Sequence, residues 1–483
     1  MKPQIATVLS DEEVARIHAA SVEILERTGV LVQSEELAAR LAEGGARVEA
    51  AGGAAGGSTA GDRSVRFPAG LTERLLGRAP ATFRLYSRNG SPPLEVGRGV
   101  TRSVAGFDAP FFQDLDTGER RPIRKADVAA FARIADSLEE VDIVGNQGIP
   151  QDVPPGTEEA HAVAALLENT GKHLIVAPDT APAARAIYKM VGTVTGTEDL
   201  GARPVVCCHI SPTSPLRWTP KACQIILETV PRGIPFLILP APMAGATAPV
   251  TLAGHLTVHN TEILSGYLIA QILREGHPVA YCNAHTLFNL REGNPLIATP
   301  ETMLLRIAGG QMARHYKIPC HSIGFDTDAH LHDEQCAWEK ALTALVGVQA
   351  GMDFLVNLGM FSTGLTVSFA QLLLDAEVFG LLKRFARGIE AGEEHVAKDL
   401  IRKVGSWGAY LEEEHTLRHF RSENWYPELS CRKLFDPWRK AGGRDVVQTA
   451  QERAREMLAR EPKAYLDAQQ SKELERIIAR ELG

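Results

Sequence analysis

The densest group of reactive side chains lies in residues 319–340, PCHSIGFDTDAHLHDEQCAWEK. Asp326 and Asp328 stand two residues apart, shortly after His321. Two carboxylates suit a cationic ligand, because burying a cation requires opposite charge or aromatic faces around it. The alternative interpretation is a solvated loop that leads into a helix starting near Asp333. The first interpretation predicts a cation-binding site built from His321, Asp326 and Asp328.

His330, His332 and Cys336 in the same segment are the residue types that bind zinc. The two histidines are only two residues apart, and no second Cys/His pair stands at zinc-finger spacing. The run from Asp328 to Asp333 also resembles the D-x-H-x-x-G motif that presents a histidine to cobalamin, but it lacks the glycine. Nucleophile-elbow and phosphate-loop motifs are absent. The sequence therefore predicts no bound metal and no tightly held cofactor.

The elements that must position these residues follow a regular order from Arg124 onward, in which helical segments alternate with short apolar strands. The first four strands end near Gln147, Pro178, His209 and Pro240, each 31 residues after the one before (178 − 147, 209 − 178 and 240 − 209). Seven such units are readable. Continuously apolar strands belong to a parallel sheet covered on both faces, so we predict an α/β fold of the (β/α)8 TIM-barrel type. A doubly wound open sheet is the competing architecture.

The missing eighth strand is either VTRSVAGF (residues 100–107) or a segment after Gly364. The predicted organisation is an N-terminal extension of helices and β-ribbons over residues 1–125, a barrel over 126–375 and C-terminal helices over 376–483. Within the extension, Ser10 and Glu13 predict a capping box for a helix that stops before Gly29. AGGAAGGSTAGDRS predicts a surface loop. The polar-aromatic segment HTLRHFRSENWYPELSCRKLFDPWRKAGG is expected to pack on the barrel or on a neighbouring subunit.

Reactive groups of such barrels lie on the loops after the strands. The polar or soft residues at those positions are Gln147, Asp179, His209, Ser211, Met243, Asn283, His285, His321, Asp326, Asp328, Met360 and Thr363. Histidines such as His209, His255 and His285 are explained better as hydrogen-bonded structural residues than as ligands. The aromatic residues near strand ends form either a cage for a methylated ammonium or part of the core: Phe107, Phe112, Trp218, Tyr281, Phe325 and Phe361.

The composition excludes several classes of protein. A net charge of -8 over 483 residues argues against nucleic acid as a partner, because phosphate binding needs clustered Lys and Arg. No apolar run follows the N-terminal Lys2, and none reaches the ~20 residues of a membrane span. Seven cysteines without a framework of spacings predict reduced thiols. We therefore expect a cytoplasmic protein without a membrane segment.

The run PMAGATAPVTLAGHLTVHNTEIL resembles the P-x-x-G-A-T-x-P-x-T-x-A-G segment of the trimethylamine methyltransferase superfamily. The resemblance extends along almost the whole chain. It includes ILERTGV, VRFPAGL and DLDTGERRPIRKADVAAFARIADSL upstream, and EGNPLIATPETMLLRIAGGQMARHY and GMFSTGLTVSFAQLLLDAEVFGLLKR downstream. The tail HTLRHFRSENWYPELSCRK resembles the branch that lacks pyrrolysine.

The resemblance implies a homo-oligomeric (β/α)8 barrel whose open top receives a corrinoid protein. The pyrrolysine of the trimethylamine enzymes corresponds to a position at or beside His321, and Asp326 and Asp328 match the acidic stretch that follows. No pyrrolysine stands here. Relatives without it demethylate quaternary amines such as glycine betaine, proline betaine or carnitine. The predicted function is therefore methyl transfer from a small quaternary amine to the cob(I)alamin of a partner corrinoid protein.

The chemistry agrees, because a quaternary ammonium is already cationic and leaves as a neutral amine. The protein need only hold the cation in line for an external cobalt(I) and exclude water. Asp326 and Asp328 are predicted to hold the cation, Phe325 and Phe361 to offer aromatic faces, and His321 to fill the vacated position or bind a carboxylate. The remaining predicted substrate-binding residues are Phe107, His209, Met243, His285, His330 and Gln335.

One departure from the family pattern leaves alternatives open. Where relatives often read D-S-K-x-x-D-x-Q-A, this chain reads DAHLHDEQC from Asp328 to Cys336, with a Ser and a Lys lost and two His gained. A metal-dependent barrel hydrolase or thiol methyltransferase that uses His330, His332 and Cys336 is one alternative. A non-catalytic protein that binds betaine or docks a corrinoid protein is the other.

Overall fold

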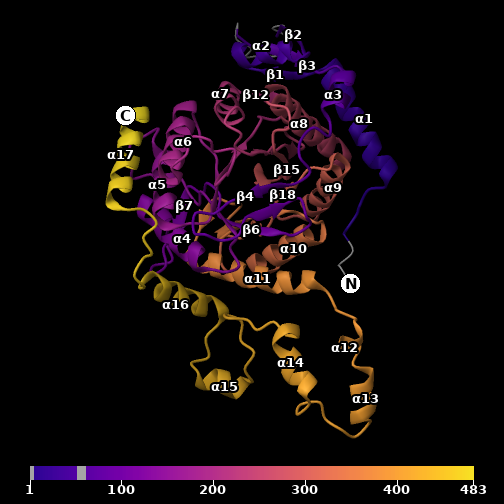
Figure 1. Cartoon of the computed structure of the whole chain (residues 1–483), viewed down its shortest axis with the longest axis vertical. Helices are drawn as coiled ribbons and strands as arrows, with labels where there is room; N and C mark the ends of the chain where they lie inside the picture. Colours follow the sequence, from indigo (N-terminus) through magenta and orange to yellow (C-terminus); the bar gives the residue numbers. More distant parts are fainter. Residues whose placement is uncertain (1–4, 52–60) are drawn as a thin grey trace.

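The computed structural model describes residues 5–51 and 61–483, and eight parallel strands close into a barrel at its centre (Figure 1). In order around the barrel the strands are β6 (Arg102–Ala105), β9 (Ile143–Gly145), β10 (His173–Val176), β11 (Val206–Ile210), β13 (Phe236–Ile238), β15 (Val279–Asn283), β18 (Cys320–Ile323) and β19 (Phe354–Leu358). The predicted TIM barrel is confirmed. β6 lies within VTRSVAGF, so the first of the two candidates is the eighth strand. The barrel thus begins near residue 102, and the predicted boundary at residue 126 is wrong.

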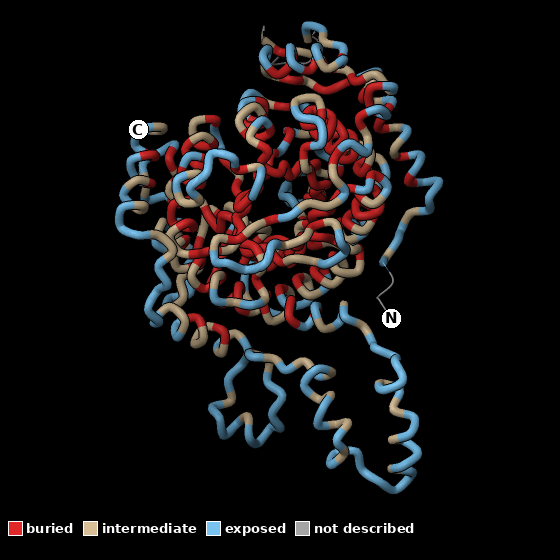
Figure 2. The backbone as a smooth tube through the Cα atoms, in the orientation of Figure 1, coloured by how far each residue is buried: buried red, intermediate tan, exposed pale blue. Residues whose placement is uncertain are grey.

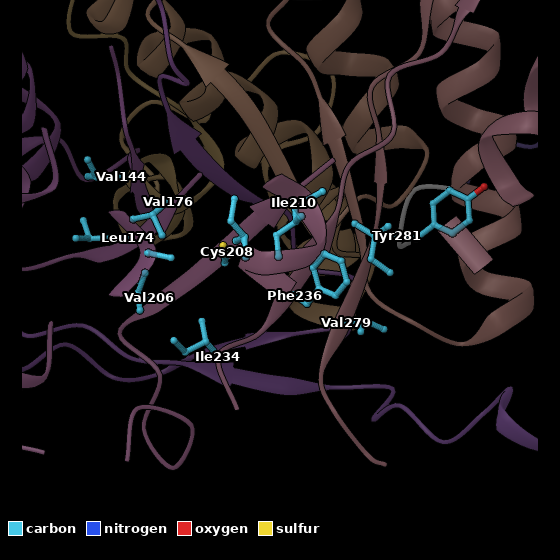
Figure 3. Packing of buried hydrophobic residues seen from close by; sticks show 14 of the residues in the cluster. Val144, Leu174, Val176, Val206, Cys208, Ile210, Ile234, Phe236, Val279 and Tyr281 are labelled. Carbon is cyan, nitrogen blue, oxygen red and sulfur yellow. The ribbon is translucent and has the colours of Figure 1, made fainter. Parts of the chain in front are cut away.

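Helices surround the barrel and cover the outer faces of its strands. They are α4 (Lys125–Ser137), α5 (Glu158–Asn169), α6 (Ala181–Thr195), α7 (Pro220–Thr229), α8 (Leu252–Leu273), α9 (Pro300–Tyr316), α10 (Glu334–Gln349) and α11 (Phe369–Arg387). Strand residues such as Val176, Cys208 and Phe236 belong to the apolar layer between strands and helices (Figure 3). This layer forms the larger core, and its close packing holds the helices against the strands.

A second, smaller apolar cluster fills the barrel itself, because alternate strand residues point to opposite faces. Cys207, Cys282 and Phe354 are among its members. Leu85 and Val96 join it from the hairpin of β4 (Phe83–Leu85) and β5 (Leu94–Val96). Since the hairpin carbonyl of Tyr86 contacts His173 at the start of β10, the hairpin closes the amino-terminal end of the barrel. The opposite end of the barrel, at the carboxyl ends of the strands, is therefore the end that can hold a functional site.

The N-terminal extension packs beside the barrel (Figure 1). Its elements are α1 (Asp11–Arg27), β1 (Val30–Val32), α2 (Glu35–Glu43), β2 (Arg47–Ala50), β3 (Arg63–Arg66) and α3 (Ala69–Leu75). The predicted capping box is present, with the Ser10 amide 2.8 Å from Oε2 of Glu13. Gly29 has a φ of 74°, and a Cβ there would lie 2.3 Å from the Val65 carbonyl oxygen. The requirement for glycine at this position explains why helix α1 ends just before it. The predicted AGGAAGGSTAGDRS loop lies largely outside the described residues.

Small sheets lie in the loops that follow the strands. One contains β7 (Phe111–Gln113), β8 (Arg120–Pro122), β20 (Met360–Phe361) and β21 (Thr366–Val367). Another contains β14 (Met243–Ala244), β16 (Thr286–Asn289) and β17 (Asn294–Leu296), and β12 (Arg217–Trp218) joins β1 of the extension. These sheets fix the loops at the carboxyl end of the barrel.

The C-terminal region divides into packed helices and a protruding arm (Figure 2). The packed helices are α16 (Val446–Leu458), which contacts α11, and α17 (Ala468–Leu482), which contacts α6. The arm holds α12 (Glu393–Val396), α13 (Lys398–Val404), α14 (Glu414–Glu423) and α15 (Phe435–Lys440), none with a buried residue. Within the described residues, no helix has the length and apolar character needed to cross a membrane.

Candidate functional site

A pocket of about 270 Å³ opens at the carboxyl ends of β10, β11 and β13, beside the first turn of α7. We call it the mouth pocket. Its walls combine apolar and polar side chains, which are Phe107, Ala177, Pro178, Asp179, His209, Ile210, Ser211, Pro212, Thr213, Thr219, Lys221, Ala222, Ile225 and Leu239. The strand-end positions Asp179, His209 and Ser211, expected from the sequence to face a site, all lie here. This end of a TIM barrel is where such sites are built.

Two predicted substrate-binding residues, Phe107 and His209, meet in the pocket wall. Their rings form an edge contact with centroids 4.4 Å apart. Phe107 is the second residue after β6, and His209 lies inside β11 with its side chain buried. Burial lowers the pKa of His209 well below its usual value, with a smaller contribution from His321. His209 is therefore neutral, so it does not repel a cation in the pocket.

Asp108 lies next to Phe107 at the end of β6 and was not predicted. Its Oδ1 accepts a hydrogen bond of 2.8 Å from the side-chain amide of Asn146. Burial raises the pKa of Asp108 to about 7, although the Asn146 hydrogen bond and the charge of Lys221 act in the opposite direction. A carboxyl group whose pKa is raised this far lacks an adequate counter-charge.

Glu159, in the first turn of α5, is a second acid in this region. It is buried, and burial raises its pKa; the charge of Asp108 also raises this pKa, whereas the charge of Lys221 lowers it. The ammonium of Lys221 is paired instead with Asp179 at the exposed rim. Within residues 5–51 and 61–483, no ion pair joins Asp108 or Glu159 to a basic side chain. Neither acid lines the mouth pocket itself, but both interact electrostatically with Lys221 in its wall, and an external cation in the pocket would favour their ionised forms.

His321, predicted to be catalytic, lies inside the barrel behind His209. The two Nε2 atoms are 3.1 Å apart, and Cys282 faces His321 across the β15–β18 ladder. All three side chains are fully buried or nearly so. Burial lowers the pKa of His321 to about 3, so this ring is neutral as well. The structure thus brings together Phe107, His209 and His321 of the predicted site residues.

Asp326 does not face the mouth pocket, and its predicted role as a holder of the substrate cation is wrong. Its Oδ2 lies 2.7 Å from Nη2 of Arg306 on α9, and its Oδ1 accepts a 2.7 Å hydrogen bond from Asn357. Nearby, Nζ of Lys340 on α10 lies 2.7 Å from Asp375 on α11 and donates to the Phe325 carbonyl at 2.6 Å. We call Arg306, Asp326, Lys340, Asn357 and Asp375 the helix-side charge network.

Asp328 also has a structural assignment, which corrects its predicted catalytic role. Its carboxylate accepts hydrogen bonds from the amides of Ile297 and Ala298, at 3.2 to 3.3 Å, and from the Thr363 hydroxyl at 3.1 Å. The carboxylate therefore fastens the loop before α9 to the loop after β20. Its acceptor sites are used by the protein, so they are not offered to a ligand.

The predicted substrate-binding residues of the following loop contact one another or the nearby helices. His330 pairs with the Ser362 hydroxyl at 2.7 Å, and Gln335 donates to Glu339 at 3.0 Å. The rings of Phe361 and His332 lie 4.9 Å apart. Of the three predicted zinc-type residues, His332 contacts Ser368 and Cys336 contacts Gln371, and among the described residues the three do not form a group of potential ligand atoms within 4.8 Å of one another. This corrects the placement of His330, Gln335 and Phe361 in a substrate site.

Three more predicted residues lie away from the mouth pocket. Phe325 is fully buried and packs against Phe379 of α11, with ring centroids 6.3 Å apart. His285 is bonded to His255 of α8 at 3.0 Å, so it lies between the barrel and that helix. Phe325 and His285 are therefore core residues, contrary to the prediction. The carbonyl of Met243 accepts hydrogen bonds from the amides of residues 246–248 and so shapes the turn after β14. The predicted contact of Met243 with substrate stays a prediction.

The sequence held one usable signal for the residues that were missed. Had VTRSVAGF been chosen as the eighth strand, Asp108 would have been the first acid after it. Glu159 and Lys221 gave no such signal, because they stand in helical first turns rather than at strand ends. Cys282 was treated only as a reduced thiol.

A closed (β/α)8 barrel with a small, acid-flanked pocket at the carboxyl ends of its strands defines a barrel protein with a small-molecule site. The model of the protein family described as Trimethylamine methyltransferase (MTTB) matches residues 2–482 of this chain. The chain therefore belongs to the trimethylamine methyltransferase family, and its reaction class is methyl transfer.

Similar proteins agree with this assignment. Trimethylamine methyltransferase MttB of Desulfitobacterium hafniense (strain DSM 10664 / DCB-2) is 31% identical, over 92% of this chain and 88% of the relative. Glycine betaine methyltransferase of Desulfitobacterium hafniense (strain Y51) is 28% identical, over 98% of this chain and 96% of the relative. The crystal structure of Methanosarcina barkeri monomethylamine methyltransferase (MtmB) has a TM-score of 0.53 at 13% identity, over 93% of this chain and 88% of that chain, which supports the fold.

Proposed function

We propose that this chain transfers a methyl group from a small quaternary amine, such as glycine betaine, to the cobalt(I) of a corrinoid carried by a partner protein. The observation that carries the proposal is Asp108, an acid without a directly bonded cation beside the mouth pocket. A permanently charged methyl donor supplies the missing positive charge. Family membership and the named glycine betaine relative support the same choice.

The mouth pocket suits a small cation with an apolar surface. Its volume of about 270 Å³ is just below the roughly 300–1,000 Å³ typical of drug-sized ligands. Leu239 and Ile225 offer methyl groups, and Phe107 offers an aromatic ring. Methylated ammonium ions combine an apolar surface with positive charge, and aromatic rings bind them through cation–π attraction. Asp108 and Glu159 would supply the long-range attraction.

The proposed reaction needs little acid–base chemistry from this chain. The methyl carbon leaves a nitrogen that is already positively charged, so the departing amine is neutral and no proton must be added. The residues of the pocket would hold the cation in one orientation and exclude water. Neutral His209 and His321 fit this role, because protonated rings would repel the substrate.

The methyl acceptor is proposed to arrive from outside. Asp179 and Lys221 at the pocket rim are each about half exposed, so the pocket opens to solvent at the carboxyl end of the barrel. In this proposal the corrinoid belongs to the partner and is not held by this chain. The partner would dock over that end and bring its metal to the exposed methyl group.

The test is to incubate the protein with a chemically reduced corrinoid and a panel of betaines, and to follow methyl–cobalt formation by its absorption. Transfer from at least one quaternary amine, greatly reduced in D108N, is the expected result. Binding of a betaine without transfer would identify a non-catalytic binding protein instead. Absence of both binding and transfer across the panel would sink the proposal.

We also propose that the arm of residues 389–445 packs against a second copy of this chain. Trp407 is 99% exposed, and Leu411 and Leu434 are also largely exposed. Large apolar side chains that a protruding segment leaves in solvent are typical of an interaction surface. W407S/L411S should dissociate the oligomer in analytical ultracentrifugation. A wild-type monomer, or an oligomer unaffected by the double substitution, would refute this proposal, and a wild-type monomer that associates only with the corrinoid protein would assign the arm to that partner.

A further inference from the structure

The interior of the barrel, behind the mouth pocket, brings His209 and His321 together with Cys282, a residue that the proposed methyl transfer does not use. Among the described residues, His209, Cys282 and His321 form a group whose potential ligand atoms all lie within 4.8 Å of one another. The three residues come from β11, β15 and β18, and each is buried. We propose that these side chains bind one divalent transition-metal ion of the zinc class.

The distances support this proposal. Zinc lies about 2.0–2.1 Å from histidine nitrogen and about 2.3 Å from cysteine sulfur, so tetrahedral ligands are separated by roughly 3.3–3.7 Å. The two Nε2 atoms are 3.1 Å apart, and Cys282 and His321 are direct partners in the parallel ladder. The Nε2–Nε2 distance needs to widen by only a few tenths of an ångström, and the Cys282 sulfur, which lies within 4.8 Å of the other ligand atoms, needs to move by at most about 1 Å, within the reach of side-chain rotation.

The ligand types and charges also fit. Thiolate and imidazole are the preferred zinc ligands, and both rings are in the neutral form that binds metal. Binding would convert the Cys282 thiol to a thiolate and release one proton per ion. Two imidazoles and one thiolate leave a net charge of +1. A hydroxide or carboxylate as the fourth ligand would cancel this charge, so that the site would not repel a cation in the neighbouring mouth pocket; three protein ligands with one open position are typical of catalytic zinc sites.

The unpaired ring atoms give a second indication and also limit the affinity. Nδ1 of His209 and Nδ1 of His321 are buried without a hydrogen-bond partner in the described chain. A direct Nε2–H···Nε2 bond would satisfy only one nitrogen of each ring. Metal-binding histidines usually donate their other N–H to a carboxylate or carbonyl, and losing such a partner costs about 10–100-fold in affinity. We therefore expect an ion that a chelator removes without unfolding the protein.

The same barrel interior offers a matched control. Cys207 on β11 lies 2.8 Å from Nε2 of His173, but this pair has no third ligand. C207S should therefore keep the ion and C282S should lose it, although both remove a buried thiol of the barrel interior. C336S tests the rival set of His330, His332 and Cys336, which the structure separates.

The experiment loads the chelator-treated full-length protein with Zn²⁺ or Co²⁺, removes the excess by gel filtration and counts the metal by mass spectrometry. Wild type, C207S and C336S should retain one ion per chain. C282S should retain no stoichiometric ion after gel filtration, because it removes one of the three protein ligands. Bound Co²⁺ should show a near-ultraviolet sulfur-to-cobalt band that C282S lacks, and thermal unfolding should confirm that C282S is folded.

Three outcomes would overturn the proposal: no stoichiometric ion in the wild type, equal retention by C282S, or loss of the ion in C336S. If C282S does not fold, H209Q replaces it and must show the same loss of metal. None of these measurements depends on methyl transfer, so the metal site stands or falls separately from the proposed function.

Discussion

The mouth pocket and the helix-side charge network both place buried acids near the carboxyl ends of the strands, but they treat the charge differently. In the network, Asp326 and Asp375 each lie 2.7 Å from a basic side chain. At the pocket, Asp108 accepts a hydrogen bond from the neutral side-chain amide of Asn146, and burial raises the pKa of Asp108 to about 7. A neutralised acid stabilises the fold, whereas an acid without a bonded cation is poised for a charged ligand.

The largest expected effect comes from breaking the network. K340M should lower the free energy of unfolding by about 3–5 kcal/mol, because it leaves buried Asp375 without its cation. The matched variant K221M also replaces a lysine by methionine, but at the exposed rim of the pocket. There the free energy of unfolding should change by less than about 1 kcal/mol. Urea unfolding of both proteins measures the difference. Equal stability losses would contradict the contrast between the two regions.

The second effect concerns binding. D108N should weaken the affinity for a quaternary amine by about 10–100-fold, equivalent to roughly 1.4–2.8 kcal/mol, with little change in stability. D179N, which alters an exposed acid at the same rim, should change the affinity less than about threefold, since exposed charges are screened. Calorimetric titration with glycine betaine provides the measurement. If D179N has the stronger effect, the cation lies at the rim and not beside Asp108.

These two regions also show how far the sequence could predict the molecule. The regular spacing of strands fixed the barrel, because each unit must cover one strand with one helix. The direction of a side chain beyond a strand end depends on distant partners. Asp326 turns to Arg306 on α9, a contact that no local pattern reveals. Asp108 was missed because β6 lies before the regular repeat begins.

The pH dependence of binding sharpens the assignment of Asp108. A quaternary ammonium keeps its charge at every pH, so any titration belongs to the protein. With the pKa of Asp108 at about 7, the ionised fraction rises about tenfold between pH 6 and pH 8. Affinity should rise by about the same factor in the wild type and stay flat in D108N. A flat wild-type profile would show that another group holds the cation.

The smallest effect distinguishes the aromatic residues of the two regions. F107L removes the ring that lines the mouth pocket, so affinity for the quaternary amine should fall by about 2–30-fold, as expected for a cation–π contribution of roughly 0.5–2 kcal/mol. F325L is the matched control, because Phe325 packs against Phe379 of α11. F325L should reduce stability and leave affinity unchanged. The opposite result would return the substrate to the loop after β18, where the sequence had placed it, and would mean that the helix-side residues move when the substrate binds.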